Sequence, residues 1–253
     1  MQNSDYLISE NPMKALVVFS LPMIIGNLFQ QAYTMADSAI VGRLVGENAL
    51  AAVGAAYSLT NIFICIAIGG GMGASVIVSQ YFGRGSYGKL KKAIYTALIS
   101  FLVISGILGG FGLLCSRNIM IALNTPAEVL DMSVTYLKIY FLGLPFLFMY
   151  NVLSSMFNAL GKSRIPLYFL IFSSVFNIVL DWSFVADFHL DVAGVAWATL
   201  IAQGVSVVGS FVVLLRELQK LEGNADGIFA KEELLPMTKI AVPSILQQST
   251  VSI

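Results

Sequence analysis

The chain has 253 residues, of which 57% are hydrophobic and only 11% are charged, and its 14 Lys and Arg balance its 14 Asp and Glu. An ordinary soluble domain carries about 25% charged residues, so these charges are too few to cover a soluble core of this size. The same counts exclude an extended basic face for nucleic acid. The composition therefore predicts an integral membrane protein, in which each charge inside the membrane needs a physical reason.

Six apolar runs are long enough to cross a bilayer, which takes about 20 residues in a helix. The runs are continuous rather than alternating, so they predict helices and not the strands of a barrel. The sequence therefore predicts an all-α membrane protein built on six transmembrane helices. The runs cover residues 15–41, 50–82, 93–115, 133–159, 165–186 and 192–215.

The loops between these runs indicate an orientation, because Lys and Arg collect on the cytoplasmic side of membrane proteins. With the N-terminus in the cytoplasm, the outer segments hold only Arg43 and Arg117, and Lys138 lies just inside the fourth run. We therefore predict a multi-pass protein of the inner membrane with a cytoplasmic N-terminus. The inner segments hold Lys14, Arg84, Lys89, Lys91, Lys92, Lys162, Arg164, Arg216, Lys220 and Lys231.

A weak internal repeat follows the sixth run. Residues 240–248 and residues 20–27 both contain small or apolar residues, then Pro, aliphatic residues and an amide. Such repeats are typical of transporters, and a seventh span with no continuation predicts a truncated chain. We expect a six-helix lobe at 1–215, a cytoplasmic linker at 216–235, and the start of helix seven of a pseudo-symmetric second lobe at 236–253.

Two carboxylates, Asp37 and Asp181, lie well inside the predicted spans. A charge at that depth costs at least about 2.5–3.5 kcal/mol, so it is a candidate functional residue by default. Polar residues at helical spacing form four stripes on otherwise apolar helices, and these stripes converge if the helices surround one cavity. Hydrogen bonding between helices without a transport role is the alternative. The stripes are Gln30, Tyr33 and Asp37; Asn151, Ser154 and Asn158; Ser174, Asn177 and Asp181; and Thr199, Gln203 and Ser206.

Depth selects four of these residues as a cation site. At 1.5 Å per residue, Asp37, Asn177, Asp181 and Thr199 all lie roughly 7–14 Å beneath the outer surface. Hard cations such as Na⁺ favour an all-oxygen set of this kind, but the two carboxylates could instead hold a proton. The sequence leaves Na⁺ and H⁺ open and requires no organic cofactor.

The remaining polar positions predict a cavity rather than an active site. We expect Gln30, Tyr33, Asn151 and Gln203 to line a substrate cavity. His189, the one histidine, lies in a predicted outer loop, where a surface position is expected. No Ser/His/Asp set, metal-hydrolase motif or nucleotide motif can be assembled, so the sequence does not support an enzyme.

Glycine and proline mark places where helices pack closely or bend. The run from Gly69 to Gly73 predicts close helix packing, with or without local unwinding, because no Lys-Ser or Lys-Thr follows it to make a phosphate loop. Pro22 lies inside the first span, where proline kinks a helix. We expect Pro22 to be a conformational hinge, and a fixed bend is the alternative.

Several stretches in a definite order carry a family resemblance. They are Leu21-Pro22 through Gln30-Gln31, Met35 to Arg43, Gly143 to Leu147 through Ala159 to Ser163, Asn177 to Asp181, and Gly194 to Thr199. In these stretches the chain resembles the N-terminal lobe of the multidrug and toxic compound extrusion (MATE) family, in the prokaryotic branch that includes the DinF-like members.

The resemblance implies a twelve-helix antiporter of two lobes that exports amphipathic, often cationic compounds in exchange for Na⁺ or H⁺. It also implies a cation site at Asp37, Asn177, Asp181 and Thr199 and a bending helix at Pro22. Many members carry Arg at the position of Asn158, where this chain departs from the family.

The expected partners of this protein are small amphipathic molecules and the lipid bilayer, and we expect a monomer at full length. One alternative is a lipid-linked oligosaccharide flippase of the same superfamily, whose cavity would need Arg or Lys for pyrophosphate. A non-transporting membrane scaffold, or a half-transporter fragment, is the other.

Overall fold

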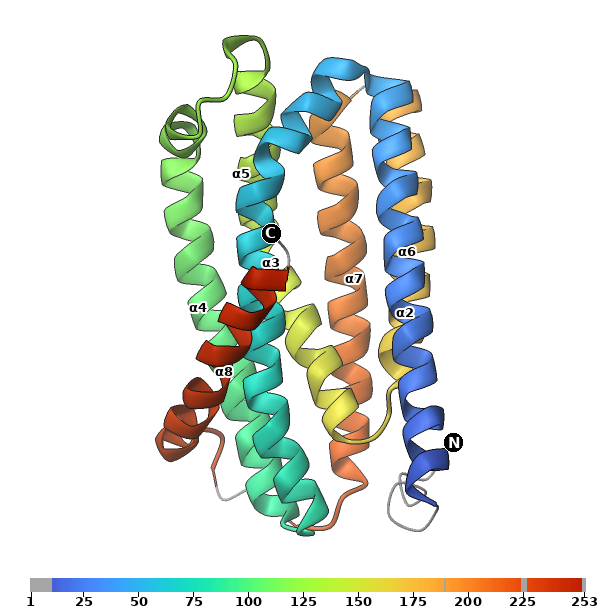
Figure 1. Ribbon diagram of the computed structural model, residues 1–253, viewed down its shortest axis with the longest axis vertical. Helices are drawn as coiled ribbons and strands as arrows, with labels where there is room; N and C mark the ends of the chain where they lie inside the picture. The colour runs from blue at the N-terminus through green and yellow to red at the C-terminus, as the bar shows by residue number, and fades with distance from the viewer. Residues whose placement is uncertain (1–10, 189, 224–226, 252–253) are drawn as a thin grey trace.

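The computed structural model describes residues 11–188, 190–223 and 227–251, so the expected surface position of His189 lies outside the described residues. All regular elements in these ranges are helical (Figure 1). Two of them, η1 and η2, are short π-helical turns. The elements are α2 (Pro12–Ile40), η1 (Val41–Val45), α3 (Glu47–Gly83), α4 (Tyr87–Ala122), α5 (Ala127–Ala159), α6 (Arg164–Trp182), η2 (Ser183–Asp187), α7 (Asp191–Gln219) and α8 (Lys231–Val251).

Within the described chain, 6 helical spans are long and apolar enough to cross a membrane, which confirms the predicted all-α membrane fold. The helix α4 extends well beyond the apolar run 93–115 that predicted it, whereas α3 matches its run 50–82 to within a few residues. Hydropathy detects only the part of a helix that lies in hydrocarbon, and the first turns of α4 carry Lys89, Lys91 and Lys92. The sequence therefore located both spans correctly but underestimated the length of α4.

The centre of the bundle is α5, which packs against α3, α4 and α7 (Figure 1). Its aromatic side chains Phe141, Phe148 and Phe157 are almost completely buried. By contrast, α2 packs mainly on α6 and η1 and leaves Leu16, Leu28 and other large apolar side chains exposed. The first helix is therefore the least buried span of the bundle.

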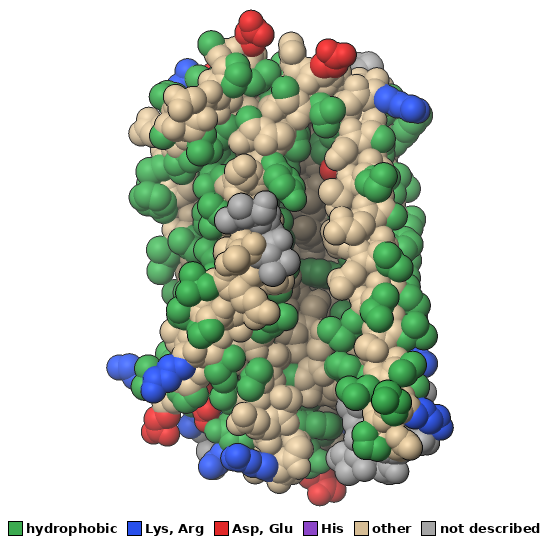
Figure 2. Space-filling model, viewed as in Figure 1, with side chains coloured by type: hydrophobic (Ala, Val, Ile, Leu, Met, Phe, Trp, Pro, Cys, Tyr) green, Lys and Arg blue, Asp and Glu red, His purple; other side chains and the backbone are tan. Residues whose placement is uncertain are grey.

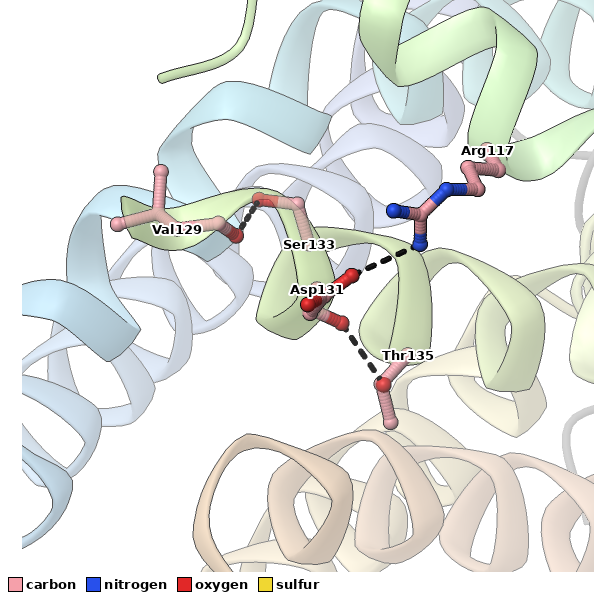
Figure 3. Close-up of polar contacts among 5 residues, drawn as sticks. All are labelled: Arg117, Val129, Asp131, Ser133 and Thr135. Carbon is pink, nitrogen blue, oxygen red and sulfur yellow. Dashed lines mark hydrogen bonds and ion pairs between the residues drawn. The ribbon is translucent and has the colours of Figure 1, made fainter. Parts of the chain in front are cut away.

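The surface of the bundle matches a bilayer. Figure 2 shows charged side chains at the two ends, an apolar belt between them, and a hollow between the α8 side and the α2 side of the visible face. At the end opposite the N-terminus, Arg117 of α4 pairs with Asp131 of α5 at 2.8 Å (Figure 3). Both side chains are more than half exposed, so this ion pair contributes little stability.

The glycine run of α3 is a site of close packing on several sides, and it remains α-helical throughout. A Cβ atom on Gly69 would lie 2.6 Å from the backbone N of Ile245 in α8, and one on Gly73 would lie 2.6 Å from the backbone O of Met237. On other faces of α3, Gly70 meets the ring of Phe101 in α4. The absence of side chains therefore lets α3 contact neighbouring helices at backbone distance.

The polar segment after α7 ends earlier than expected. We predicted a linker over residues 216–235, whereas α7 continues to Gln219 and α8 begins at Lys231. The first turn of α8 carries Glu232 and Glu233, which favour a helix N-terminus electrostatically but hide the helix from a hydropathy reading.

We predict that Gly73→Ala lowers the stability of the full-length protein by about 1–3 kcal/mol, because the added methyl group meets backbone that cannot move aside. Thermal unfolding in detergent measures this. Gly106→Ala is the matched control, since its Cβ would meet nothing within 4 Å. Equal melting temperatures for the two variants would contradict the close packing of α3 on α8.

Candidate functional site

The two intramembrane carboxylates lie at equivalent places on neighbouring helices. Asp37 is in the last turn of α2, directly before η1, and Asp181 is in the last turn of α6, directly before η2. The helices α2 and α6 pack side by side (Figure 1). Single π-helical turns often accompany functional sites, and here one follows each carboxylate.

Asn177 connects the carboxylates to α7. With its amide nitrogen toward the carboxylates, it donates to Asp181 Oδ2 at 2.9 Å and to Tyr33 Oη at 3.0 Å. Its oxygen then accepts from the Thr199 backbone N–H at 3.1 Å. This orientation pairs every donor with an acceptor, which is the criterion for assigning an amide. Tyr33 also lies within hydrogen-bonding reach of the Thr199 side chain.

The carboxylates of Asp37 and Asp181 lie within hydrogen-bonding reach of each other. Asp181 is fully buried, and Asn177 is 2% exposed. Among the described residues, Oδ1 of Asp37 and Oδ1 of Asp181 are buried atoms without a hydrogen-bond partner. A buried charged oxygen without a partner is costly, so this arrangement fits a bound cation or a proton.

A pocket between α2, α5, α6 and α7 has Tyr33 and Asn177, the hydrogen-bonded neighbours of Asp181, in its lining, whereas the two carboxylates themselves do not line it. A second pocket lies between α5 and α7. Thr199 and Gln203 of α7 line both cavities. The first of these pockets is partly polar, whereas the second is lined mainly by apolar side chains, and Thr199 and Gln203 connect the two.

The structure brings most of the predicted site residues together. Gln30, Tyr33 and Gln203 line the first cavity. Asn151 is not among the described residues that line these two cavities. It donates its amide N–H to the Leu147 carbonyl of its own helix at 2.8 Å, so its role in substrate binding stays a prediction.

Sequence reasoning missed two tyrosines of the second cavity, Tyr136 and Tyr140 of α5. They stand four residues apart and therefore on one face of the helix. Tyr140 donates to the backbone O of Thr60 in α3 at 3.1 Å. Their spacing was available in the sequence, but aromatic residues inside apolar runs do not stand out as polar groups.

Pro22 is buried inside α2, which continues through it as one helix. Proline has no N–H, so the helix lacks one backbone hydrogen bond at this point. One turn earlier, Ser163 before α6 donates its hydroxyl to the Phe19 carbonyl at 3.1 Å. Near Pro22, α2 is thus held by a side-chain hydrogen bond from the α5–α6 turn.

A bundle of membrane-spanning helices with a buried carboxylate pair and an adjoining polar pocket defines a polytopic membrane protein. The MatE family profile matches residues 22–183. The chain belongs to this family, and its six-helix bundle corresponds to the N-terminal lobe of MATE transporters, which confirms the predicted resemblance.

Two relatives from Bacillus subtilis (strain 168) illustrate the similarity. The chain is 30% identical to the probable multidrug resistance protein YpnP, over 96% of this chain and 54% of that protein. It is 29% identical to the probable multidrug resistance protein YoeA, over 82% of this chain and 45% of that protein. The chain therefore spans about half the length of the curated relatives it matches.

Solved structures show the same fold. The outward-facing conformation of a multidrug resistance MATE family transporter of the MOP superfamily matches with a TM-score of 0.90 at 24% identity, covering 100% of this chain and 56% of that chain. A crystal structure of MATE in the bent conformation matches with a TM-score of 0.88 at 24% identity, covering 100% of this chain and 56% of that chain.

We predict that Asn177→Ala lowers the stability of the full-length protein by about 1–3 kcal/mol, because Asp181 and Tyr33 lose a buried partner. Asn151→Ala is the control, since that amide bonds only a carbonyl of its own helix in the structure described. Thermal unfolding of the purified variants measures both. A larger loss for Asn151→Ala would contradict the hydrogen bonds assigned to Asn177.

Proposed function

We propose that the full-length protein is a secondary active antiporter that exports amphipathic, cationic compounds in exchange for Na⁺ or H⁺. The observation that carries this proposal is the pair of buried, partnerless oxygens on Asp37 and Asp181 beside a cavity. The printed names of the relatives, which refer to multidrug resistance and multidrug export, support the substrate class.

The cation site would consist of Asp37, Asp181, Asn177 and Thr199. A Na⁺ ion bound there would be coordinated by oxygens of Asp37, Asp181 and Thr199, and Asn177 would contribute its own oxygen only after its amide turns away from the orientation described above. A proton would instead be shared by the two carboxylates. Either cation would offset the repulsion between α2 and α6 that two adjacent carboxylates create. Coupling requires that the cation bind the inward-open and outward-open states with different affinity.

The first cavity has the chemistry expected for an organic cation. Tyr33 and Tyr150 provide aromatic surface, Gln30 and Gln203 provide polar contacts, and the carboxylates provide negative charge nearby. A positively charged substrate and the coupling cation would both be attracted by the same two carboxylates. Competition between them is a simple physical basis for exchange.

The placement in the membrane is part of the proposal. We propose a multi-pass protein of the inner membrane with a cytoplasmic N-terminus and a monomeric full-length state. The turn between α5 and α6, which holds Lys162, and the end of α7, next to Lys220, lie at the end of the bundle where α2 begins (Figure 1). Both lysines pair with Glu217. Basic residues at that end support a cytoplasmic assignment.

The alternative functions receive less support. A flippase for pyrophosphate-linked sugars would need Arg or Lys in the cavity, whereas none of the described residues that line the two pockets is Arg or Lys. A scaffold without transport activity gives no reason for two buried carboxylates, since these lower the stability of a bundle in lipid.

We predict that Asp37→Asn and Asp181→Asn each abolish export of a fluorescent organic cation by the full-length protein in proteoliposomes. Neutralising either residue removes the charge change that couples the cation to transport. Separate Na⁺ and proton gradients identify the coupling ion in the parent protein. The control is Asp131→Asn, a carboxylate that is 84% exposed and pairs with Arg117.

Normal export by both Asp37→Asn and Asp181→Asn, with expression equal to that of the parent, would reject the cation site. Loss of export in Asp131→Asn as well would indicate a general effect of removing acidic residues. No export by the parent protein under either gradient would reject the proposed function itself.

We predict that Pro22→Ala reduces export several-fold while the coupling cation identified for the parent protein still stabilises the variant against heat. Alanine restores the N–H that α2 lacks at this position, so the helix bends less readily. Pro126→Ala, outside any helix at the start of α5, is the control for removing a proline. Unchanged export by Pro22→Ala would favour a fixed bend over a hinge.

A further inference from the structure

Each carboxylate of the pair is followed about one helical turn later by a buried valine in a π-helical turn. Val41, the first residue of η1, follows Asp37, and Val185 of η2 follows Asp181. The two valines are 1% and 6% exposed. Because α2 and α6 both run toward the end of the bundle opposite the N-terminus (Figure 1), the valines lie between the carboxylates and that end.

The two valines belong to an apolar cluster that other helices complete. The helices α3 and α7 begin at this same end of the bundle, and their first two turns contribute Ala49, Val192 and Val195. Each of these three residues is 2% exposed. We call the five residues Val41, Ala49, Val185, Val192 and Val195 the valine cluster. Although they lie close to helix ends, their side chains are almost completely inaccessible to water.

The elements around the valine cluster pack closely on one another. The turn η1 packs against α3 and α7, η2 packs against α7, and η1 and η2 touch. A Cβ atom on Gly194 of α7 would lie 3.1 Å from the Cβ of Phe184 in η2, so the glycine allows this close approach. Val45 of η1 and Val53 of α3 pack around the cluster. These apolar side chains offer no hydrogen-bond partner to water, which needs about two to four of them.

Deeper in the bundle, the carboxylates adjoin polar groups. Asn177 and Tyr33 each lie one turn before a carboxylate, and both line the first pocket. Asn177 donates to Asp181 and to Tyr33. Tyr136 of α5 packs against the valine cluster, lines the second pocket, and lies near enough to both carboxylates to interact with their charges. The pair therefore lies between an apolar layer at the end of the bundle and the first pocket deeper inside it.

We propose that the valine cluster is a seal that closes the route from the carboxylate pair to water at the end of the bundle opposite the N-terminus. The coupling cation then reaches the pair through the first pocket. This inference rests on the proposed function, because a seal is needed only where a cation is coupled to transport. An antiporter exposes its cation site to one side of the membrane at a time, and apolar constrictions exclude ions by dewetting. A route past the valine cluster would let cations cross without substrate whenever the pocket faces the other side.

Cation flux without substrate tests the seal in the full-length protein in proteoliposomes. Val185→Ser and Val185→Ala remove nearly the same volume and differ in polarity, and an apolar cavity stays dry whereas a hydroxyl gives water a partner. We expect Val185→Ser to raise the flux of the coupling cation several-fold over the parent, and Val185→Ala to stay close to it. Val134→Ser is the control, because Val134 is a 5% exposed valine near the start of α5 in a different apolar cluster.

Val195→Ser and Val195→Ala repeat the comparison on α7, so the test stands if position 185 does not tolerate serine. Melting temperatures identify the variants that are folded. Parent-level flux in the folded serine variants would overturn the proposal. A rise of the same size in the alanine variants or in Val134→Ser would also overturn it, because loosened packing, and not water at the valine cluster, would then carry the cation.

If the parent protein shows no cation-driven export, the proposed function fails, and thiol labelling still decides whether the valine cluster is dry. Val192→Cys is placed in a full-length chain whose native cysteines, Cys65 and Cys115 among them, are replaced by Ala. In lipid nanodiscs both ends of the bundle face water, and 2-aminoethyl methanethiosulfonate reacts with the hydrated thiolate. We expect much slower labelling than for Leu190→Cys, a position that is 44% exposed at the same end, and acceleration by Val185→Ser but not by Val185→Ala. Equally fast labelling at positions 192 and 190 would overturn the seal.

Discussion

The arrangement of this protein depends on two carboxylates that are placed where water is scarce. Asp37 and Asp181 lie on adjacent helices within reach of each other, and each retains a buried oxygen without a described partner. Their burial would destabilise the bundle unless neighbouring groups or a cation offset it. Asn177, Tyr33 and Thr199 supply part of this compensation, and the remainder explains why a cation-coupled role fits the site.

The helices near this pair differ in how extensively they pack against the rest of the bundle. The helix that carries Asp37 touches the bundle mainly through α6 and η1, whereas α5 is surrounded on several sides. Proline interrupts the hydrogen bonds of α2, and a π-helical turn follows its carboxylate. At the other side of the bundle, α8 packs at backbone distance on α3. Loose attachment near the carboxylates and tight attachment elsewhere suit a site that responds to its ligand.

The sequence predicted much of the site because helical rise and periodicity are fixed quantities. They placed Asp37, Asn177, Asp181 and Thr199 at one depth on inward faces, and the structure brings these four together. The same reasoning placed Asn151 in the cavity lining, whereas its amide bonds a carbonyl of its own helix. It did not select Tyr136 and Tyr140, which line the second pocket, because both lie within an apolar run. A stripe of polar residues predicts that one face of a helix is buried away from lipid, but it does not predict which residues of other helices that face contacts.

Composition and hydropathy by themselves determined the membrane class, the 6 spans and the faces on which polar residues gather, because these follow from local chain geometry and transfer energies. Only the tertiary structure decided which helices are neighbours, since pairing in lipid depends on close packing between residues distant in sequence. The sequence therefore could not predict that Gly69 and Gly73 contact the backbone of α8, which the tertiary structure shows. For the same reason, the sequence did not predict that Lys91 of α4 bonds the backbone of Leu221 and Gly223 after α7.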